Sequence, residues 1–143
     1  MFSKSCEYAI RTVLFLAIYP QEITGVEILA EKLDVPRHFL AKILQQLSRN
    51  RLISSVKGRK GGFYLNEENK KQNLLSVIDC IEGPGFFQHC IIGLANCSSA
   101  SPCPYHHLIA TYREEFYTLL KNETIEESAR RINADNLQLQ NHH

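Results

Sequence analysis

Three of the five cysteines, Cys90, Cys97 and Cys103, lie within fourteen residues, and His106 follows three positions later. The run that holds them is rich in Gly, Ser and Pro, a composition typical of a loop. Buried structural cysteines more often lie singly in apolar segments. Several thiols on one loop are typical of metal or cluster ligands, or of redox partners. The sequence therefore predicts a ligand loop or a thiol redox site here.

The spacing of these thiols bears on the choice of metal. Structural zinc sites typically hold cysteines about two to four residues apart, whereas six and then five residues separate the thiols here. Iron–sulfur clusters use thiolate ligands, and zinc is the main rival. The remaining cysteines, Cys6 and Cys80, fall in helical segments, where we interpret both as small core residues.

Composition is ordinary for a soluble globular protein. The N-terminus has no basic segment followed by an apolar run and a cleavage site, so we read no signal peptide and expect a cytoplasmic protein without a membrane span. An odd number of cysteines cannot all pair within one chain. We find no nucleophile–base arrangement or phosphate-cradling loop, and we expect no enzymatic activity.

Positive charge is concentrated in one segment. Residues 37–60 carry seven Lys or Arg and no Asp or Glu, so this segment is +7 and the rest of the chain is −6, within a net charge of +1. A basic stripe on a nearly neutral protein indicates a phosphate-binding face. The alternative is a solvated charged helix, although such helices usually mix both signs.

The first two expected helices lead into the basic segment. Apolar residues recur at helical spacing over 3–19, and Pro20 ends this helix. Thr24 and Glu27 match a capping box, which predicts a second helix that begins after Thr24 and stops near Asp34.

A basic helix and a hairpin complete the module. Pro36 stands at the expected first position of a third helix, which continues to about Asn50. Residues 53–56 and 63–65 indicate short strands, joined by a glycine-rich turn with three cations. This order predicts a winged helix-turn-helix.

The rest of the chain is expected to be helical outside the cysteine loop. A helix over 74–82, the loop 86–103 and a long helix from 104 to about 121 are predicted, and Thr124 with Glu127 forms a capping box for a short last helix. The long helix carries an apolar stripe that a partner chain would cover, unless the helix packs on its own domain. The stripe residues are Leu108, Ile109, Tyr112, Phe116, Leu119 and Leu120.

The expected fold is mainly α with a small β-hairpin wing. It divides into a winged helix-turn-helix domain (1–82), a cysteine-rich loop (83–104) and a dimerisation helix with a short C-terminal helix (105–135). In such modules the second helix of the motif enters the major groove, and the wing reaches the minor groove or the backbone. The candidate DNA-binding residues are Arg37, His38, Ala41, Lys42, Lys57, Arg59 and Lys60.

The chain resembles the Rrf2 family of winged-helix repressors, which has iron–sulfur and nitric-oxide-sensing members. The resemblance rests on three parts of the chain: residues 7–11 (EYAIR), residues 52–58 (LISSVKG) with Gly61 and Gly62, and the three cysteines before the long helix. It implies a cytoplasmic homodimer on a palindromic DNA operator, with one cluster per subunit and double-stranded DNA as partner.

The resemblance also implies the ligands. Cys90, Cys97 and Cys103 match the three thiolates, and the fourth ligand is either His106 or Glu7, which would come from the partner's first helix. We favour a 2Fe–2S over a 4Fe–4S cluster, which the purified protein can lack. One residue more separates Cys90 from Cys97 than in close relatives. The alternative is a cluster-independent regulator of the same family that senses a metabolite, a partner enzyme or thiol redox state.

Overall fold

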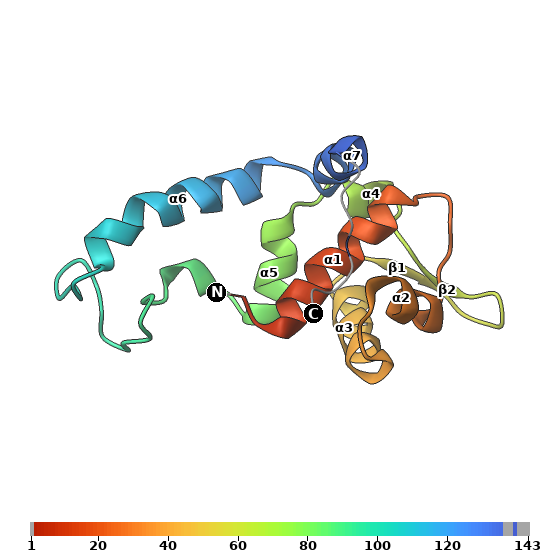
Figure 1. Cartoon of the computed structure of the whole chain (residues 1–143), viewed down its shortest axis with the longest axis horizontal. Helices are drawn as coiled ribbons and strands as arrows, with labels where there is room; N and C mark the ends of the chain where they lie inside the picture. Colours follow the sequence, from red (N-terminus) through yellow and green to blue (C-terminus); the bar gives the residue numbers. More distant parts are fainter. Residues whose placement is uncertain (1, 136–138, 140–143) are drawn as a thin grey trace.

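The computed structural model describes residues 2–135 and residue 139. Within that part of the chain the fold is mainly helical with one antiparallel hairpin, as predicted (Figure 1). The elements are α1 (Lys4–Ile18), α2 (Val26–Leu33), α3 (Arg37–Arg49), β1 (Ser54–Val56), β2 (Gly62–Tyr64), α4 (Glu67–Lys70), α5 (Leu74–Glu82), the 3-10 turn η1 (Phe86–Gln88), α6 (His106–Asn122) and α7 (Ile125–Asp135).

The helix-turn-helix has the expected elements but different caps. Thr24 does not cap α2, because its backbone pairs with the wing: its N–H donates to Phe63 O at 3.0 Å and its C=O accepts from Phe63 N at 2.8 Å. Gly25 occupies the N-cap without a side-chain bond, so the predicted capping box is wrong. Pro36 is the N-cap of α3, and the helix therefore begins at Arg37, one residue later than predicted.

The wing is a hairpin held against the chain that precedes α2. Ser54 pairs with Tyr64 and Val56 with Gly62. A Cβ on Gly62 would lie 2.5 Å from the carbonyl carbon of Thr24, so only glycine permits this close approach. The wing is therefore anchored on two sides, through its own ladder and through Thr24.

One core joins the helices of the module to the end of the chain. It is built from fully buried aliphatic side chains of α1, α2 and α3, such as Leu16, Leu29 and Leu44. Ile125 of α7 is also fully buried in it, and α7 packs against α1. The predicted Thr124–Glu127 capping box is confirmed, since each residue's backbone N–H donates to the other's side chain.

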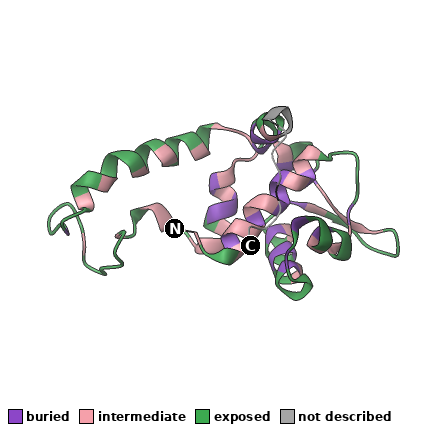
Figure 2. Ribbon diagram, in the orientation of Figure 1, coloured by how far each residue is buried: buried purple, intermediate pink, exposed green. Residues whose placement is uncertain are grey.

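Helix α6 extends away from this core as an arm. Figure 1 shows the cysteine loop at the far end of the arm, opposite the wing, and Figure 2 shows that buried positions gather in the other helices. None of the α6 residues is buried. No helix in the described part of the chain is long and apolar enough to cross a membrane.

Candidate functional site

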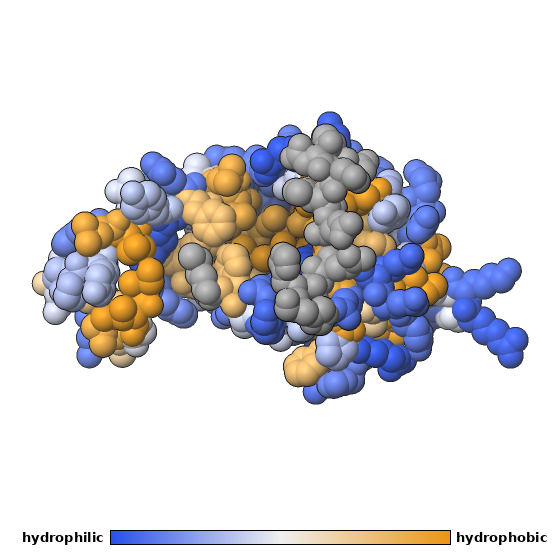
Figure 3. Space-filling view, viewed as in Figure 1, coloured by the Kyte–Doolittle hydropathy of each residue, from blue (hydrophilic) through white to orange (hydrophobic). Residues whose placement is uncertain are grey.

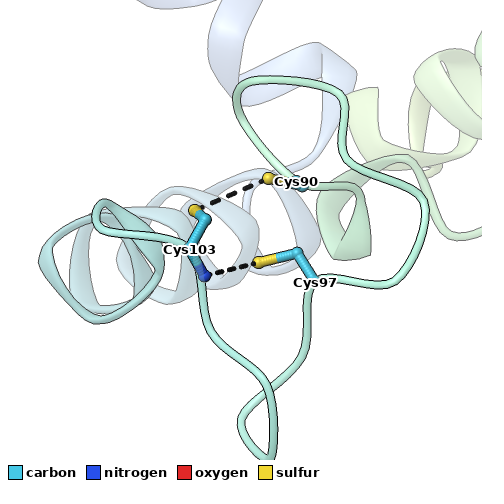
Figure 4. Close-up of side chains that lie close together, drawn as sticks. All are labelled: Cys90, Cys97 and Cys103. Atoms are coloured by element: carbon cyan, nitrogen blue, oxygen red, sulfur yellow. Dashed lines mark hydrogen bonds between the residues drawn. The ribbon is translucent and has the colours of Figure 1, made fainter.

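The three loop cysteines converge on one point. Their sulfur atoms all lie within 4.8 Å of one another, and the side chains point toward a common centre (Figure 4). Cys90 and Cys103 are closest, with their Sγ atoms 3.7 Å apart, and the backbone N–H of Cys103 donates to the Cys97 sulfur at 3.3 Å. The extra residue between Cys90 and Cys97 is thus accommodated, and all three predicted thiols meet.

The sequence-predicted fourth ligands lie in different places. His106 is the first residue of α6, and its Nδ1 is 3.3 Å from the Cys97 sulfur. Glu7 lies on α1, where its carboxylate pairs with Lys4 at 3.0 Å. Neither residue belongs to the group of ligand atoms that approach within 4.8 Å of one another in the described part of the chain.

The loop environment separates the pKa values of two thiols. Desolvation raises the pKa of Cys90, but hydrogen bonds from the backbone of Leu94 and Ile92 and from the neighbouring thiols outweigh it and bring the pKa to about 7. The backbone N–H of Cys103 lowers the pKa of Cys97, yet burial and the two nearby thiols raise it overall. The Cys90 thiol is therefore more easily ionised than the Cys97 thiol.

The other two cysteines lie outside this site. Cys6 is fully buried in α1, and burial together with the charge of Glu82 raises its pKa to about 12. Cys80 is half-buried on α5, and its thiol donates to the carbonyl oxygen of Gln46 on α3 at 3.7 Å. Both pack in or against the core, as we interpreted them.

Aromatic side chains tie the cysteine loop to α6 and to the N-terminus. The ring of Phe87 lies 5.8 Å from Phe116 and 5.7 Å from Tyr117, and Phe2 stacks on Phe86 at 5.4 Å. Phe2 also approaches Phe116 at 6.3 Å. Sequence periodicity placed Phe116 on the expected dimer stripe, but its ring meets this cluster of the same chain instead.

The stripe on α6 divides into two faces. Ile109, Phe116 and Leu120 are half-buried, and Phe116 meets Phe87 of the loop. Leu108, Tyr112 and Leu119 are exposed by 67%, 71% and 53% respectively. The second face leaves large apolar side chains in solvent, which is the usual mark of an interaction surface when they are contiguous.

The predicted recognition residues line the start of α3. Arg37, His38 and Lys42 are exposed there, while Ala41 is half-buried. Phe39, which the sequence argument did not include, is also exposed by 48%. One side of α3 therefore exposes these side chains, while its buried aliphatic side packs on the core.

A groove of about 1070 Å³ separates the wing from α2 and α3. The predicted wing cations Lys57, Arg59 and Lys60 line it, and Figure 3 shows hydrophilic side chains projecting at this end of the molecule. Arg49 of α3 and Glu27 of α2 line it as well. Sequence reasoning missed Arg49 as a groove residue because its place depends on the wing folding back toward α2.

This arrangement of two helices, a basic recognition helix and a basic hairpin defines a winged helix-turn-helix protein. The chain belongs to the Rrf2 family: residues 2–131 match the family's model, described as an iron-dependent transcriptional regulator. The resemblance inferred from the sequence is thereby confirmed. Members of this family are transcriptional regulators that bind DNA.

Relatives and solved structures agree with the family. The chain is 30% identical over 129 residues to an Aquifex aeolicus protein named as a candidate HTH-type transcriptional regulator, covering 89% of this chain and 90% of the relative. It is 25% identical over 126 residues to the HTH-type regulator NsrR of Oceanobacillus iheyensis, covering 87% and 86%.

Two solved structures share the fold. CymR, the global cysteine regulator of B. subtilis, aligns with a TM-score of 0.73 at 21% identity over 92% of this chain and 97% of that one. IscR of T. potens aligns with a TM-score of 0.72 at 17% identity over 96% and 91%.

Proposed function

We propose that this chain is a cytoplasmic, dimeric repressor whose DNA binding responds to an iron–sulfur cluster held by Cys90, Cys97 and Cys103. The observation that carries the proposal is the convergence of these three thiols in a chain of an iron-dependent regulator family. In this proposal the winged module binds DNA, the cysteine loop senses the signal, and α6 forms the dimer.

The donor set fits metal ligation by its own geometry. Two thiolates bound at about 2.3 Å to one tetrahedral ion stand about 3.8 Å apart. The Cys90 and Cys103 sulfurs are 3.7 Å apart, and all three sulfurs are within 4.8 Å. Cys90 and Cys103 are therefore spaced to bind one iron of a cluster, or a zinc ion, together.

The fourth ligand distinguishes two forms of the site. His106 is already 3.3 Å from Cys97, and a histidine ligand would raise the potential of the cluster. Glu7 of the partner subunit is the other candidate, which would make the site complete only in the dimer. We favour His106 and a 2Fe–2S cluster, since His106 contacts a thiol within the same chain.

The exposed apolar face of α6 supports dimerisation through this helix. The exposed face formed by Leu108, Tyr112 and Leu119 needs a cover, and burying one such side chain fully contributes about 1.5–3 kcal/mol. A two-fold dimer would present two recognition helices, so its operator would be a palindrome with half-sites about one helical turn apart.

The contacts also supply a route for the signal. The loop holds α6 and the N-terminus through Phe87, Phe116 and Phe2, and the Ser3 hydroxyl and backbone N–H both donate to Glu82 at the end of α5. A change in the loop would therefore reach α1 and α5, which pack on the recognition helix α3.

Anaerobic purification tests the cluster. We expect the wild type to show visible absorption with matching iron and acid-labile sulfide, and the Cys97→Ala variant to lose them. Cys80→Ala is the matched control, because Cys80 lies outside the site. Iron without sulfide, or zinc alone, in reconstituted wild type would contradict the cluster.

A second candidate function is thiol redox sensing by the same regulator. It is favoured by the 3.7 Å approach of Cys90 to Cys103 and by the pKa of about 7 at Cys90. A colourless wild type whose DNA affinity changes with oxidant, and recovers with thiol reductant, would support this candidate over the cluster.

A further inference from the structure

An acidic side chain lies where the proposed DNA interface should be basic. Among the residues that line the groove between the wing and α2–α3, Glu27 is the one acid, and it shares this lining with the cations Arg49, Lys57, Arg59 and Lys60. A carboxylate near a phosphate backbone weakens binding by charge repulsion. Its presence calls for a compensating role.

Glu27 is engaged by the recognition helix. It lies in the first turn of α2, and its Oε1 accepts a hydrogen bond from Nε of Arg37, the first residue of α3, at 3.0 Å. Both side chains are largely exposed, so this ion pair contributes little to the stability of the fold. Pairing with Arg37 lowers the pKa of Glu27, which keeps the carboxylate ionised at neutral pH.

The bond uses one particular edge of the guanidinium. Nε is occupied by Glu27, which leaves the two terminal nitrogens and their four N–H groups. Those terminal nitrogens form the fork that binds guanine O6 and N7 in the major groove. An arginine anchored at Nε keeps fewer orientations than a free one, so less freedom is lost when the fork engages a base.

We propose that Glu27 is a positioning residue for sequence recognition: it holds Arg37 by Nε so that the terminal fork reads a guanine. The inference rests on the proposed DNA-binding function and adds a specificity determinant on a helix outside the recognition helix. Glu27 itself touches no base; it lowers affinity for any duplex and raises preference for the right one.

The test compares two DNA probes. One is a duplex selected by the wild type from a random library, and the other is an unselected duplex of equal length. A bidentate arginine–guanine contact discriminates by roughly 5- to 150-fold. We expect Glu27→Ala, which removes the acceptor as well as the charge, to bind the unselected duplex more tightly than the wild type does and to lose about tenfold in preference for the selected one. Glu31→Ala, the same change one turn along α2, should leave the preference unchanged.

The double variant separates positioning from charge. Arg37→Ala should lose the preference too, and adding Glu27→Ala to it should lower the preference no further, because both act through one contact. Equal gains by Glu27→Ala on both duplexes would reduce Glu27 to a repelling charge and overturn the inference. Loss of about 0.9 in the salt slope of Arg37→Ala, with equal affinity losses on both probes, would assign Arg37 to a phosphate and overturn it as well.

The proposed function can fail separately. A wild type that retains no duplex from the library in preference to others would remove sequence-specific DNA binding, and the role of Glu27 would fall with it. A wild type that selects a sequence, with Glu27→Ala selecting the same one as strongly, would remove only the role of Glu27.

Discussion

Replacing Gly62 tests whether the wing is held in place by the segment before α2. In Gly62→Ala, the added Cβ would lie 2.5 Å from the carbonyl carbon and 2.6 Å from the carbonyl oxygen of Thr24, which no backbone tolerates without moving. The two hydrogen bonds between Thr24 and Phe63 would then break. Each contributes about 0.5–1.5 kcal/mol, so the free energy of unfolding should fall by about 1–3 kcal/mol.

Two assays measure this change. At about 3 °C per kcal/mol for a chain of this size, the melting temperature should drop by roughly 3–10 °C. The displaced wing would withdraw Lys57, Arg59 and Lys60 from DNA, and each lost phosphate contact reduces the slope of log affinity against log salt by about 0.9. The slope should therefore fall by as much as about 2.7.

Gly25→Ala is the matched control for this change. Its Cβ would meet only the carbonyl oxygen of Gly61, at an ordinary 3.9 Å. This variant should lose less than about 1 kcal/mol and keep the salt slope. If Gly62→Ala has the same melting temperature as Gly25→Ala and keeps the wild-type salt slope of DNA affinity, the wing is not positioned by the Thr24 pairing.

Three further changes probe other parts of the fold. Leu108→Asp combined with Tyr112→Asp should convert the proposed dimer to a monomer in sedimentation at micromolar concentration, while Glu114→Lys on the same helix should not. A double variant that stays dimeric would place the interface elsewhere. Thr124→Ala removes the N-cap of α7 and should cost about 1 kcal/mol, measured as a lower denaturation midpoint with an unchanged slope. Burial and the charge of Glu82 raise the pKa of Cys6 from 9.0 to about 12. The folded thiol therefore stays protonated while the unfolded thiol ionises above about pH 9, so this contribution to stability should be fully present below pH 9 and decline toward pH 12. The free energy of unfolding of Cys6→Ala, measured at both ends of this window, should decline less than that of the wild type.

Local sequence signals predicted the helices and the wing because they depend on neighbours in the chain. The capping box at Thr124 and Glu127 forms because the β-bridge between Thr124 and Asn73 uses the N–H of Ile125 and leaves the N–H of Thr124 to Glu127. The equivalent pattern at Thr24 and Glu27 fails, since Thr24 pairs with Phe63 and Glu27 binds Arg37. The same four-residue motif thus has two outcomes, and tertiary partners decide between them.

The candidate site was predictable in its thiols and less so in its surroundings. Cys90, Cys97 and Cys103 share one short loop, so their convergence was predictable from the sequence, and the loop absorbs the extra residue. The inward half of the α6 stripe could not be assigned, because Phe116 meets Phe87 only once the chain folds back. Helical periodicity reports which residues share a face and not what covers it.

The placement of the two ends of the molecule limits how the cysteine loop could affect DNA binding. The loop and the wing lie at opposite ends of the long axis (Figure 1), which leaves direct contact between them out of reach within one chain. Helix α5 runs directly into the loop, its residue Glu82 accepts from Ser3 at the start of α1, and its residue Cys80 donates to Gln46 on α3. We infer that a change at the cysteines reaches the recognition helix through α5 and α1, since both helices pack on α3.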